Sequence, residues 1–125
     1  MISLEQILHI HDILIHKYGG SSGVRDLTLL ESAINRPFAT YAQQSLYPSP
    51  ISQAAVLLES LIGNHPFVDG NKRTGYLVFR AFLQENGYDI NLNREEKYEF
   101  VINVASGTLK GEALITFIKL HTIKN

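Results

Sequence analysis

The stretch His-Pro-Phe-Val-Asp-Gly-Asn-Lys-Arg, residues 65–73, links two apolar segments of helical periodicity and organises the rest of the chain. The pattern after it predicts a helix that begins near Thr74, so Lys72 and Arg73 fall at a helix N-terminus. The positive end of the helix dipole lies there, which makes cations unfavourable unless an anion joins them. The unpaired backbone N–H groups of a first helical turn also favour an anion. We therefore predict a phosphate-binding site at this turn.

The same stretch supplies the other parts of a phosphoryl- or nucleotidyl-transfer site. His65 is suited to general base catalysis, because histidine titrates close to neutral pH. Asp69 can bind a hard cation such as Mg²⁺, which proteins hold with one or two carboxylates plus substrate phosphates. Glycine allows close approach of a ligand to the backbone, and amide, ammonium and guanidinium groups donate to phosphate oxygens. The phosphate contacts are therefore predicted at Gly70, Asn71, Lys72 and Arg73.

Each of these residues has an ordinary structural explanation when taken singly. Histidine before proline and the dipeptide Asp-Gly are frequent in turns, and a Lys-Arg pair is usually a solvated surface. These explanations do not account for cations at a helix N-terminus just after an acid, so the joint pattern favours a site. The other histidines share no metal-ligand spacing and are interpreted as surface or partly buried residues: His9, His11, His16 and His121.

Helical periodicity recurs along the chain, and no alternating β pattern is visible, so we predict an all-α fold. Capping residues and glycines mark the ends of about six helices in a compact bundle. They run from Leu4 to Tyr18, from a cap at Asp26 or Thr28 to Asn35, from Pro50 to Gly63, from near Thr74 to Asn86, from a cap at Asn93 to Gly107, and from about Lys110 to His121. Residues 38–50 are the one long irregular segment, and residues 88–93 are a connection.

Composition limits the classes of function. With 125 residues, 45% hydrophobic and 18% charged, the chain fits one globular domain, residues 1–125. A net charge of −1 makes nucleic acid a poor candidate partner. Cysteine is absent, which excludes disulfides and fits a reducing compartment, and no apolar run approaches the length of a membrane span. We expect a cytoplasmic protein that contacts no membrane.

Residues 65–73 resemble the signature of the Fic superfamily, His-Pro-Phe-x-x-Gly-Asn-Gly-Arg, and more closely its Doc (death-on-curing) branch, which has lysine where Lys72 stands. Residues 18–26, 30–37 and 85–88 also resemble Doc stretches, so the similarity covers about residues 10–107. The motif is specific, because several residue types must coincide at fixed spacing before a helix.

The resemblance implies a Fic-type helical fold and a set of roles. The residue matching His65 would deprotonate a hydroxyl on a target protein, and the residue matching Asp69 would hold Mg²⁺. Asn71, Lys72 and Arg73 match the residues that bind the phosphates of ATP. Doc toxins transfer the γ-phosphate to the translation factor EF-Tu, whereas most Fic enzymes transfer AMP. A lysine side chain at position 72 fills the space that glycine would leave for a phosphate, which gives a physical reason for the difference.

Two departures from the wider Fic pattern bear on regulation. Self-regulating Fic enzymes often carry a second arginine three residues after the first, where this chain has Tyr76. They also carry an inhibitory helix of the form Ser/Thr-x-x-x-Glu-Gly/Asn, and the nearest match, Thr108 to Glu112, is followed by Ala113. The resemblance therefore implies restraint in trans by a Phd-like antitoxin whose disordered tail folds onto the toxin.

Residues 38–50 have two interpretations. In Fic proteins this connection forms a flap that holds the target in extended form, and Tyr41 and Tyr47 would lie on it. The other interpretation is a surface loop with aromatic anchors packed on the core. Three functions remain in competition for the whole chain: a Doc-type kinase of a type II toxin-antitoxin system, a Fic-type AMP or other nucleotidyl transferase, and a partner-binding module without catalysis.

Overall fold

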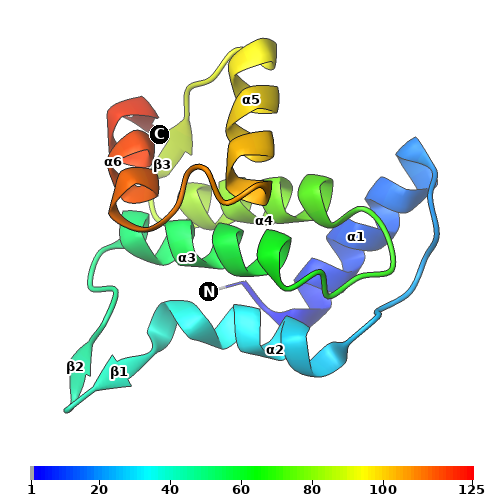
Figure 1. Cartoon of the computed structure of the whole chain (residues 1–125), viewed down its shortest axis with the longest axis horizontal. Coiled ribbons are helices and arrows are strands. Elements are labelled where there is room, and N and C mark those ends of the chain that lie inside the picture. Colours follow the sequence, from blue (N-terminus) through cyan, green and yellow to red (C-terminus); the bar gives the residue numbers. More distant parts are fainter. Residues whose placement is uncertain (1) are drawn as a thin grey trace.

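The fold is all-α, and helices make up most of the chain in the computed structural model, which describes residues 2–125 (Figure 1). The six α-helices are α1 (Leu4–Tyr18), α2 (Leu27–Asn35), α3 (Pro50–Gly63), α4 (Asn71–Glu85), α5 (Arg94–Ala105) and α6 (Gly111–His121). The shorter elements are a 3₁₀ turn, η1 (Arg36–Phe38), and the strands β1 (Thr40–Tyr41), β2 (Gln44–Ser45), β3 (Tyr88–Ile90) and β4 (Thr122–Lys124). The predicted bundle of about six helices is confirmed.

Helices α3 and α4 run in opposite directions through the centre of the molecule (Figure 1). Nine of the fourteen residues of α3 are buried, because α2, α4, α5 and α6 all pack against it. Gly75 of α4 permits a close approach to α3, since a Cβ atom there would lie 2.9 Å from Cγ1 of Ile62. The loop that joins the two helices, residues 64–70, therefore starts and ends on the most tightly packed part of the core.

Helix α1 packs along α4, and α2 packs on α3. The capping box predicted from Ser3 and Gln6 is present at the start of α1. At the start of α2 the side chain of Asp26 accepts a hydrogen bond from the N–H of Leu29, which identifies the cap. The connection between α1 and α2 passes beside the loop of residues 64–70 and pairs with it.

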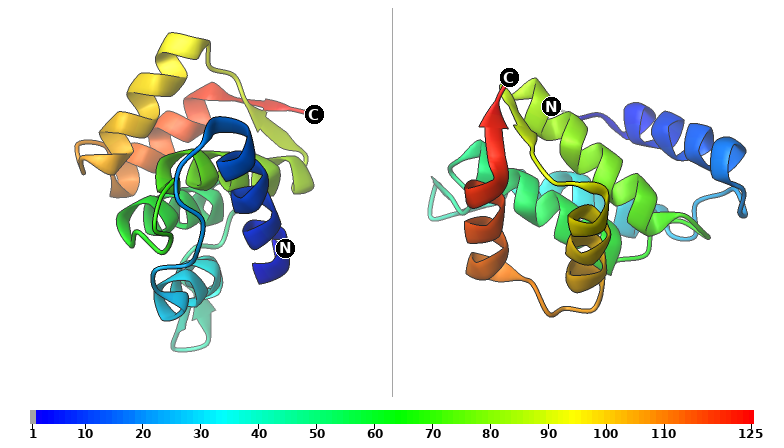
Figure 2. Two further views of the ribbon diagram at one scale, coloured as in Figure 1. Left: turned by 90° about the vertical axis from the view of Figure 1, so that its right-hand side faces the viewer. Right: turned by 90° about the horizontal axis from the view of Figure 1, so that it is seen from above.

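Helices α5 and α6 both pack on α3 and are joined by aromatic rings. Phe100 of α5 stacks on Phe117 of α6 with ring centroids 5.0 Å apart, and it also contacts Phe79 of α4 at 5.9 Å. After α6 the chain forms β4, which lies antiparallel to β3 (Figure 2). These elements cover the side of α3 and α4 that α1 and α2 leave free.

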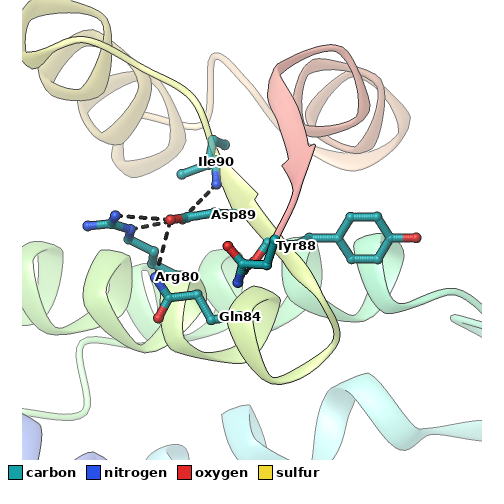
Figure 3. A network of polar contacts seen from close by, with 6 residues as sticks. Arg80, Gln84, Tyr88, Asp89 and Ile90 are labelled. Atoms are coloured by element: carbon teal, nitrogen blue, oxygen red, sulfur yellow. Dashed lines mark hydrogen bonds and ion pairs between the residues drawn. The ribbon is translucent and has the colours of Figure 1, made fainter.

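An ion pair ties β3 to α4 (Figure 3). The guanidinium of Arg80 donates from Nε and Nη2 to the two carboxylate oxygens of Asp89, at 2.9 and 3.0 Å. Gln84 and the main-chain N–H of Ile90 donate to the same carboxylate. The hydrogen bonds from Arg80 are the main reason why the pKa of Asp89 is lowered to about 2.

Strands β1 and β2 form a hairpin inside the segment predicted to be irregular. Ala42 and Gln43 at its tip have φ values of 51° and 66°, which suits a two-residue turn that matches strand twist. Figures 1 and 2 place the hairpin at the N-terminal end of α3, whereas the loop of residues 64–70 follows its C-terminal end. A helix of fourteen residues separates these ends by roughly 20 Å.

The base of this hairpin is held by aromatic contacts with the helical body. The Phe38 ring lies 6.5 Å from that of Phe82, and the Arg36 guanidinium lies 6.0 Å from the ring of Tyr47. Of the two interpretations of residues 38–50, the arrangement favours a surface segment with aromatic anchors, because the hairpin does not reach the loop of residues 64–70.

Besides the hairpin in the segment predicted to be irregular, two local predictions were wrong. Helix α4 begins at Asn71 rather than near Thr74, because Gly70 with a φ of 77° starts the helix one turn earlier. Residues 88–93 contain β3 rather than a plain connection, since their pairing partner lies more than thirty residues away in the sequence. Among residues 2–125, no helix combines the length and the apolar character needed to cross a membrane.

Candidate active site

The loop of residues 64–70 begins with a strained turn at His65. Its φ of 47° lies in the left-handed region, which residues other than glycine rarely adopt. Arg25 holds this turn: its Nε donates to the carbonyl of His65 at 2.7 Å and its Nη2 donates to that of Asn64 at 2.9 Å. The main-chain N–H of Arg25 donates to the carbonyl of Pro66 at 2.8 Å. The His65 residue itself is exposed.

Phe67 anchors the middle of the loop in the core, where it is 2% exposed. Its main chain pairs with Val24 as an isolated antiparallel bridge. The side-chain oxygen of Asn71 accepts from the N–H of Phe67 at 2.9 Å, and its Nδ2 donates to the carbonyl of Phe67 at 3.0 Å. The side-chain amide of Asn71 therefore ties the loop to the first residue of α4. The predicted contact of Asn71 with phosphate depends mainly on the main-chain N–H of Asn71.

Asp69 lies where the loop meets the α1–α2 connection. One carboxylate oxygen accepts from the N–H of Gly70 at 2.8 Å, and the other accepts from the N–H of Ser21 at 3.2 Å. Gly20 makes this approach possible, since a Cβ atom there would lie 2.7 Å from Oδ2 of Asp69. Each oxygen still has a second lone pair, and Asp69 is exposed, so the carboxylate remains available to a cation.

The N-terminus of α4 is open. Gly70 is its N-cap and supplies no side chain to cap the helix. The first main-chain bond of the helix runs from the N–H of Thr74 to the carbonyl of Gly70 at 3.0 Å. The N–H groups of residues 71–73 precede it and make no hydrogen bond to any residue from 2 to 125. Three unpaired donors at the positive end of a helix form an anion-binding arrangement.

Two cations stand beside these donors. Lys72 is exposed and forms no ion pair with any residue between 2 and 125. Arg73 is also exposed, and its guanidinium lies over the ring of Tyr18, 4.4 Å from the ring centroid. No carboxylate of the described chain neutralises either charge. The structure therefore leaves the charges of Lys72 and Arg73 unpaired beside the open N–H groups, while His65, Asp69 and Gly70 lie on the loop that leads into this turn.

Two residues that hold the loop were not predicted. His11 was interpreted as an ordinary histidine, yet it is 4% exposed and its Nε2 lies 2.8 Å from the carbonyl oxygen of Asp69. Arg25 lies within residues 18–26, which resemble a Doc stretch, but the sequence predicts no role for it. The one sequence signal for His11 is its position in the apolar stripe of the first predicted helix, where a polar ring requires a partner. The partner itself is 58 residues away and has no local signature.

The residues of the loop fit a Mg²⁺ ion that is coordinated partly by the protein and partly by substrate phosphates. Residues 2–125 contain no group of three or more His, Asp or Glu side chains that could hold a metal ion by themselves. Mg²⁺ needs only one or two protein carboxylates when substrate phosphates complete its coordination. The free lone pairs of Asp69, next to the open N-terminus of α4, match that requirement.

The fold and the site define a class of protein: a small helical domain that carries its candidate site on the loop before a central helix. The chain belongs to the Fic/DOC family, which it matches over residues 1–83. That range includes the whole loop and nearly all of α4. The resemblance to the Fic superfamily and its Doc branch is thereby confirmed.

The similar proteins include some named as Doc toxins or kinases and others named as Fic adenylyltransferases. Toxin Doc of Mycolicibacterium smegmatis is 43% identical over 83 residues, which cover 63% of this chain and 64% of that protein. Protein kinase doc of Escherichia phage P1 is 30% identical over 108 residues, covering 86% of this chain and 84% of the kinase. Protein adenylyltransferase Fic of Drosophila melanogaster is 32% identical over 87 residues, covering 67% of this chain but only 17% of that enzyme. The chain thus spans a little under two thirds of the Mycolicibacterium protein and a small part of the Drosophila enzyme.

Proposed function

We propose that this protein is a Doc-type toxin of a type II toxin-antitoxin system, a cytoplasmic kinase that transfers the γ-phosphate of ATP to a Ser or Thr hydroxyl of EF-Tu and so blocks translation. The observation that carries the proposal is the open N-terminus of α4, where three unpaired N–H groups stand beside the unneutralised side chains of Lys72 and Arg73. Similarity to the phage protein named a kinase supports the reaction type.

The chemistry assigns one task to each part of the loop. The imidazole of His65 takes the proton of the target hydroxyl as its oxygen attacks the γ-phosphorus. The bond from that phosphorus to the β,γ-bridging oxygen breaks, and ADP leaves with its electron pair. The N–H groups of residues 71–73, with Lys72 and Arg73, hold the phosphate oxygens. Asp69 would hold Mg²⁺, which when bound neutralises charge on the phosphates.

Nucleotidyl transfer is the alternative, and similarity to the Drosophila adenylyltransferases favours it. In that reaction the same deprotonated hydroxyl attacks the α-phosphorus, AMP is transferred and pyrophosphate leaves. The two reactions need the same base and the same cations, but a different phosphorus atom of the nucleotide must lie next to the target hydroxyl. Lys72 favours the kinase, because its side chain occupies space that glycine would leave open beside the helix N-terminus.

Restraint by a Phd-like antitoxin is part of the proposal. The segment nearest to an inhibitory helix, Thr108 to Glu112, precedes and enters α6, which begins only at Gly111. Residues 108–112 therefore form no separate helix. They lie between α5 and α6, on the side of α3 and α4 that faces away from α1 and α2. In this proposal the inhibitor is therefore supplied by another chain.

ATP labelled at either the γ- or the α-phosphate tests the reaction directly. We expect EF-Tu to gain label only from the γ position, together with a mass increase of one phosphate. Label that arrives only from the α position would reject the kinase and establish nucleotidyl transfer. Absence of modification with both labels, tested on whole lysate as well as on EF-Tu, would contradict both reactions.

A binding module without catalysis is the third possibility, and toxicity separates it from an enzyme. Replacing His65 with Ala should abolish growth inhibition, because an enzyme of this mechanism loses its base. Inhibition retained at equal expression would favour the binding module. His16→Ala is a matched control, since His16 is exposed and, within residues 2–125, forms its hydrogen bond and ion pair with Asp12 of its own helix alone.

A further inference from the structure

We propose that two side chains outside the loop, Arg25 and His11, position its two halves separately. Arg25 fixes the turn that presents His65, and His11 fixes the Asp69–Gly70 end that receives metal and phosphate. The inference rests on the proposed function for the roles of His65 and Asp69. Neither Arg25 nor His11 touches a substrate in this assignment, so both act through other residues.

Arg25 binds three successive carbonyls of the chain. Its guanidinium bridges the carbonyls of Asn64 and His65, and its main-chain N–H binds that of Pro66. The carbonyls of Asn64 and His65 belong to the peptide groups on either side of His65, which set its backbone dihedral angles. A φ of 47° is unfavourable for histidine and persists only where neighbouring contacts hold it. Charge-assisted donors to two adjacent carbonyls supply such contacts.

The hydrogen bonds from Arg25 set the direction in which the His65 imidazole points. A return of His65 to a negative φ would turn its Cα–Cβ bond and move the ring away from its present place. The Asp69 end of the loop would keep its contacts, because Phe67 is anchored in the core between the two ends. Loss of the Arg25 grip should therefore displace the base while the phosphate site stays intact.

His11 holds the other end from α1. Its ring stacks on Phe67 with centroids 3.8 Å apart and planes within 7°. Because a carbonyl can only accept, Nε2 of His11 carries the proton and donates to the carbonyl of Asp69 at 2.8 Å. A Cβ atom at Gly70 would lie 3.8 Å from the same nitrogen, so the ring lies directly beside the N-cap.

The peptide group held by His11 joins the candidate metal ligand to the cap of α4. Rotation of that group would move the N–H of Gly70, which bonds to the carboxylate of Asp69, and would change the start of the helix. The Asp69 carboxylate and the open N–H groups of residues 71–73 would move together. Loss of the His11 bond should therefore weaken binding of Mg²⁺ and ATP, while His65 keeps its own anchor at Arg25.

The test is a crossed comparison of variants of the full chain, with EF-Tu and ATP as substrates and Mg²⁺ as the metal ion. Arg25→Met keeps the stem of the side chain but removes its donors, and it should lower kcat by about 10-fold or more with little change in the Mg²⁺ and ATP concentrations for half-maximal rate. His11→Phe keeps an aromatic ring against Phe67 but removes the donor. It should raise those concentrations by about 10-fold and leave kcat at saturation within about 3-fold.

Two conservative variants serve as controls. Arg25→Lys keeps the charge but cannot bridge two carbonyls, so it should restore only part of kcat. His11→Gln keeps an amide donor near the place of Nε2, so it should restore binding of Mg²⁺ and ATP better than Phe does. The melting temperature of every variant is measured alongside. Kinetic losses that affect both parameters equally and follow the melting temperature would show a merely structural role and overturn the inference.

Failure of the inference and failure of the proposed function are distinguishable. Loss of transfer in His65→Ala supports the proposed function whatever the Arg25 and His11 variants do. If the wild type transfers nothing to any protein, calorimetry with ATP and Mg²⁺ still decides the His11 part, because His11→Phe must weaken binding and Arg25→Met must not. NMR of the His65 ring decides the Arg25 part. Ring resonances that Arg25→Met leaves unchanged would overturn it.

Discussion

The guanidinium of Arg73 lies over the ring of Tyr18, 4.4 Å from its centroid, so the last residue of α1 supports a cation in the first turn of α4. The contact joins two elements that flank the candidate site. A guanidinium held over an aromatic face keeps N–H groups free to donate to an anion, because the contact is with the face of the ring and uses no hydrogen-bond acceptor.

Arg73→Ala should therefore weaken ATP binding, by about 10-fold or more, because a charge-assisted phosphate contact is lost. Tyr18→Ala should weaken it only a few-fold, roughly the value of one exposed cation–π contact, and Tyr18→Phe should have no effect. Isothermal calorimetry with ATP and Mg²⁺ measures all three. Unchanged affinity in Arg73→Ala would remove this residue from the phosphate site.

Lys72→Gly tests what sets the orientation of the nucleotide. If the lysine side chain excludes the pose needed for AMP transfer, the variant should shift from phosphate toward AMP on the target. Mass spectrometry of the modified target separates the two adducts. Lys72→Ala is the control for loss of charge alone, because the Cβ atom of alanine still covers the backbone that glycine would leave open. Pure phosphate transfer by both variants would mean that another feature chooses the reaction.

Asp89→Asn should lower the stability of the fold in a pH-dependent way. The pKa of Asp89 is lowered from 3.8 to about 2 in the folded protein, mainly by hydrogen bonds from Arg80. The ionised carboxylate therefore stabilises the folded state at pH values above the unfolded pKa of 3.8. This stabilisation is lost as the pH falls from about 4 through about 2.

The side chain of Arg80 is 45% exposed, so solvent reduces the effect, and we expect the substitution to cost about 1–2 kcal/mol at pH 7. Urea unfolding of wild type and variant at pH 7 and again below pH 3 measures the difference. A cost that stays equal at both pH values would show that ionisation of Asp89 is not its source. Glu112→Gln, at an exposed position with no contact to this ion pair, is the control.

Thr74→Val should preserve or raise stability. Thr74 is fully buried, and its hydroxyl has no hydrogen-bond partner among residues 2–125. Valine has nearly the same shape and removes the unsatisfied group, for an expected gain of up to about 1 kcal/mol. Thr74→Ser keeps the hydroxyl and loses a buried methyl, so it should destabilise by about 1 kcal/mol. A valine variant less stable than the serine variant would contradict this account.

The helices could be predicted from the sequence because their signals are local. The capping box at Ser3 and Gln6, the proline at the start of α3 and the box at Asn93 each act within one turn, and all are present in the structure. The start of α4 was misplaced, because it depends on the positive φ of Gly70 and on the bonds from Asn71 to Phe67. The pairing of β3 with β4 has no local signal at all.

The candidate site likewise has a part that local sequence predicts and a part that it does not. The spacing of His65, Asp69, Lys72 and Arg73 was enough to predict which residues gather around a helix N-terminus, since they lie on one short loop. Beyond the position of His11 in an apolar stripe, no sequence signal indicates what holds that loop, because its supports are 40 and 58 residues away.

The amino-acid sequence by itself determined the helices and the family, because capping, periodicity and a nine-residue motif all act over short range. Only the tertiary structure decided that Arg25 grips the turn at His65 and that His11 holds the carbonyl of Asp69. It also decided that the hairpin lies at the far end of α3. These relationships depend on how separate helices pack, and packing brings together residues that no local pattern connects.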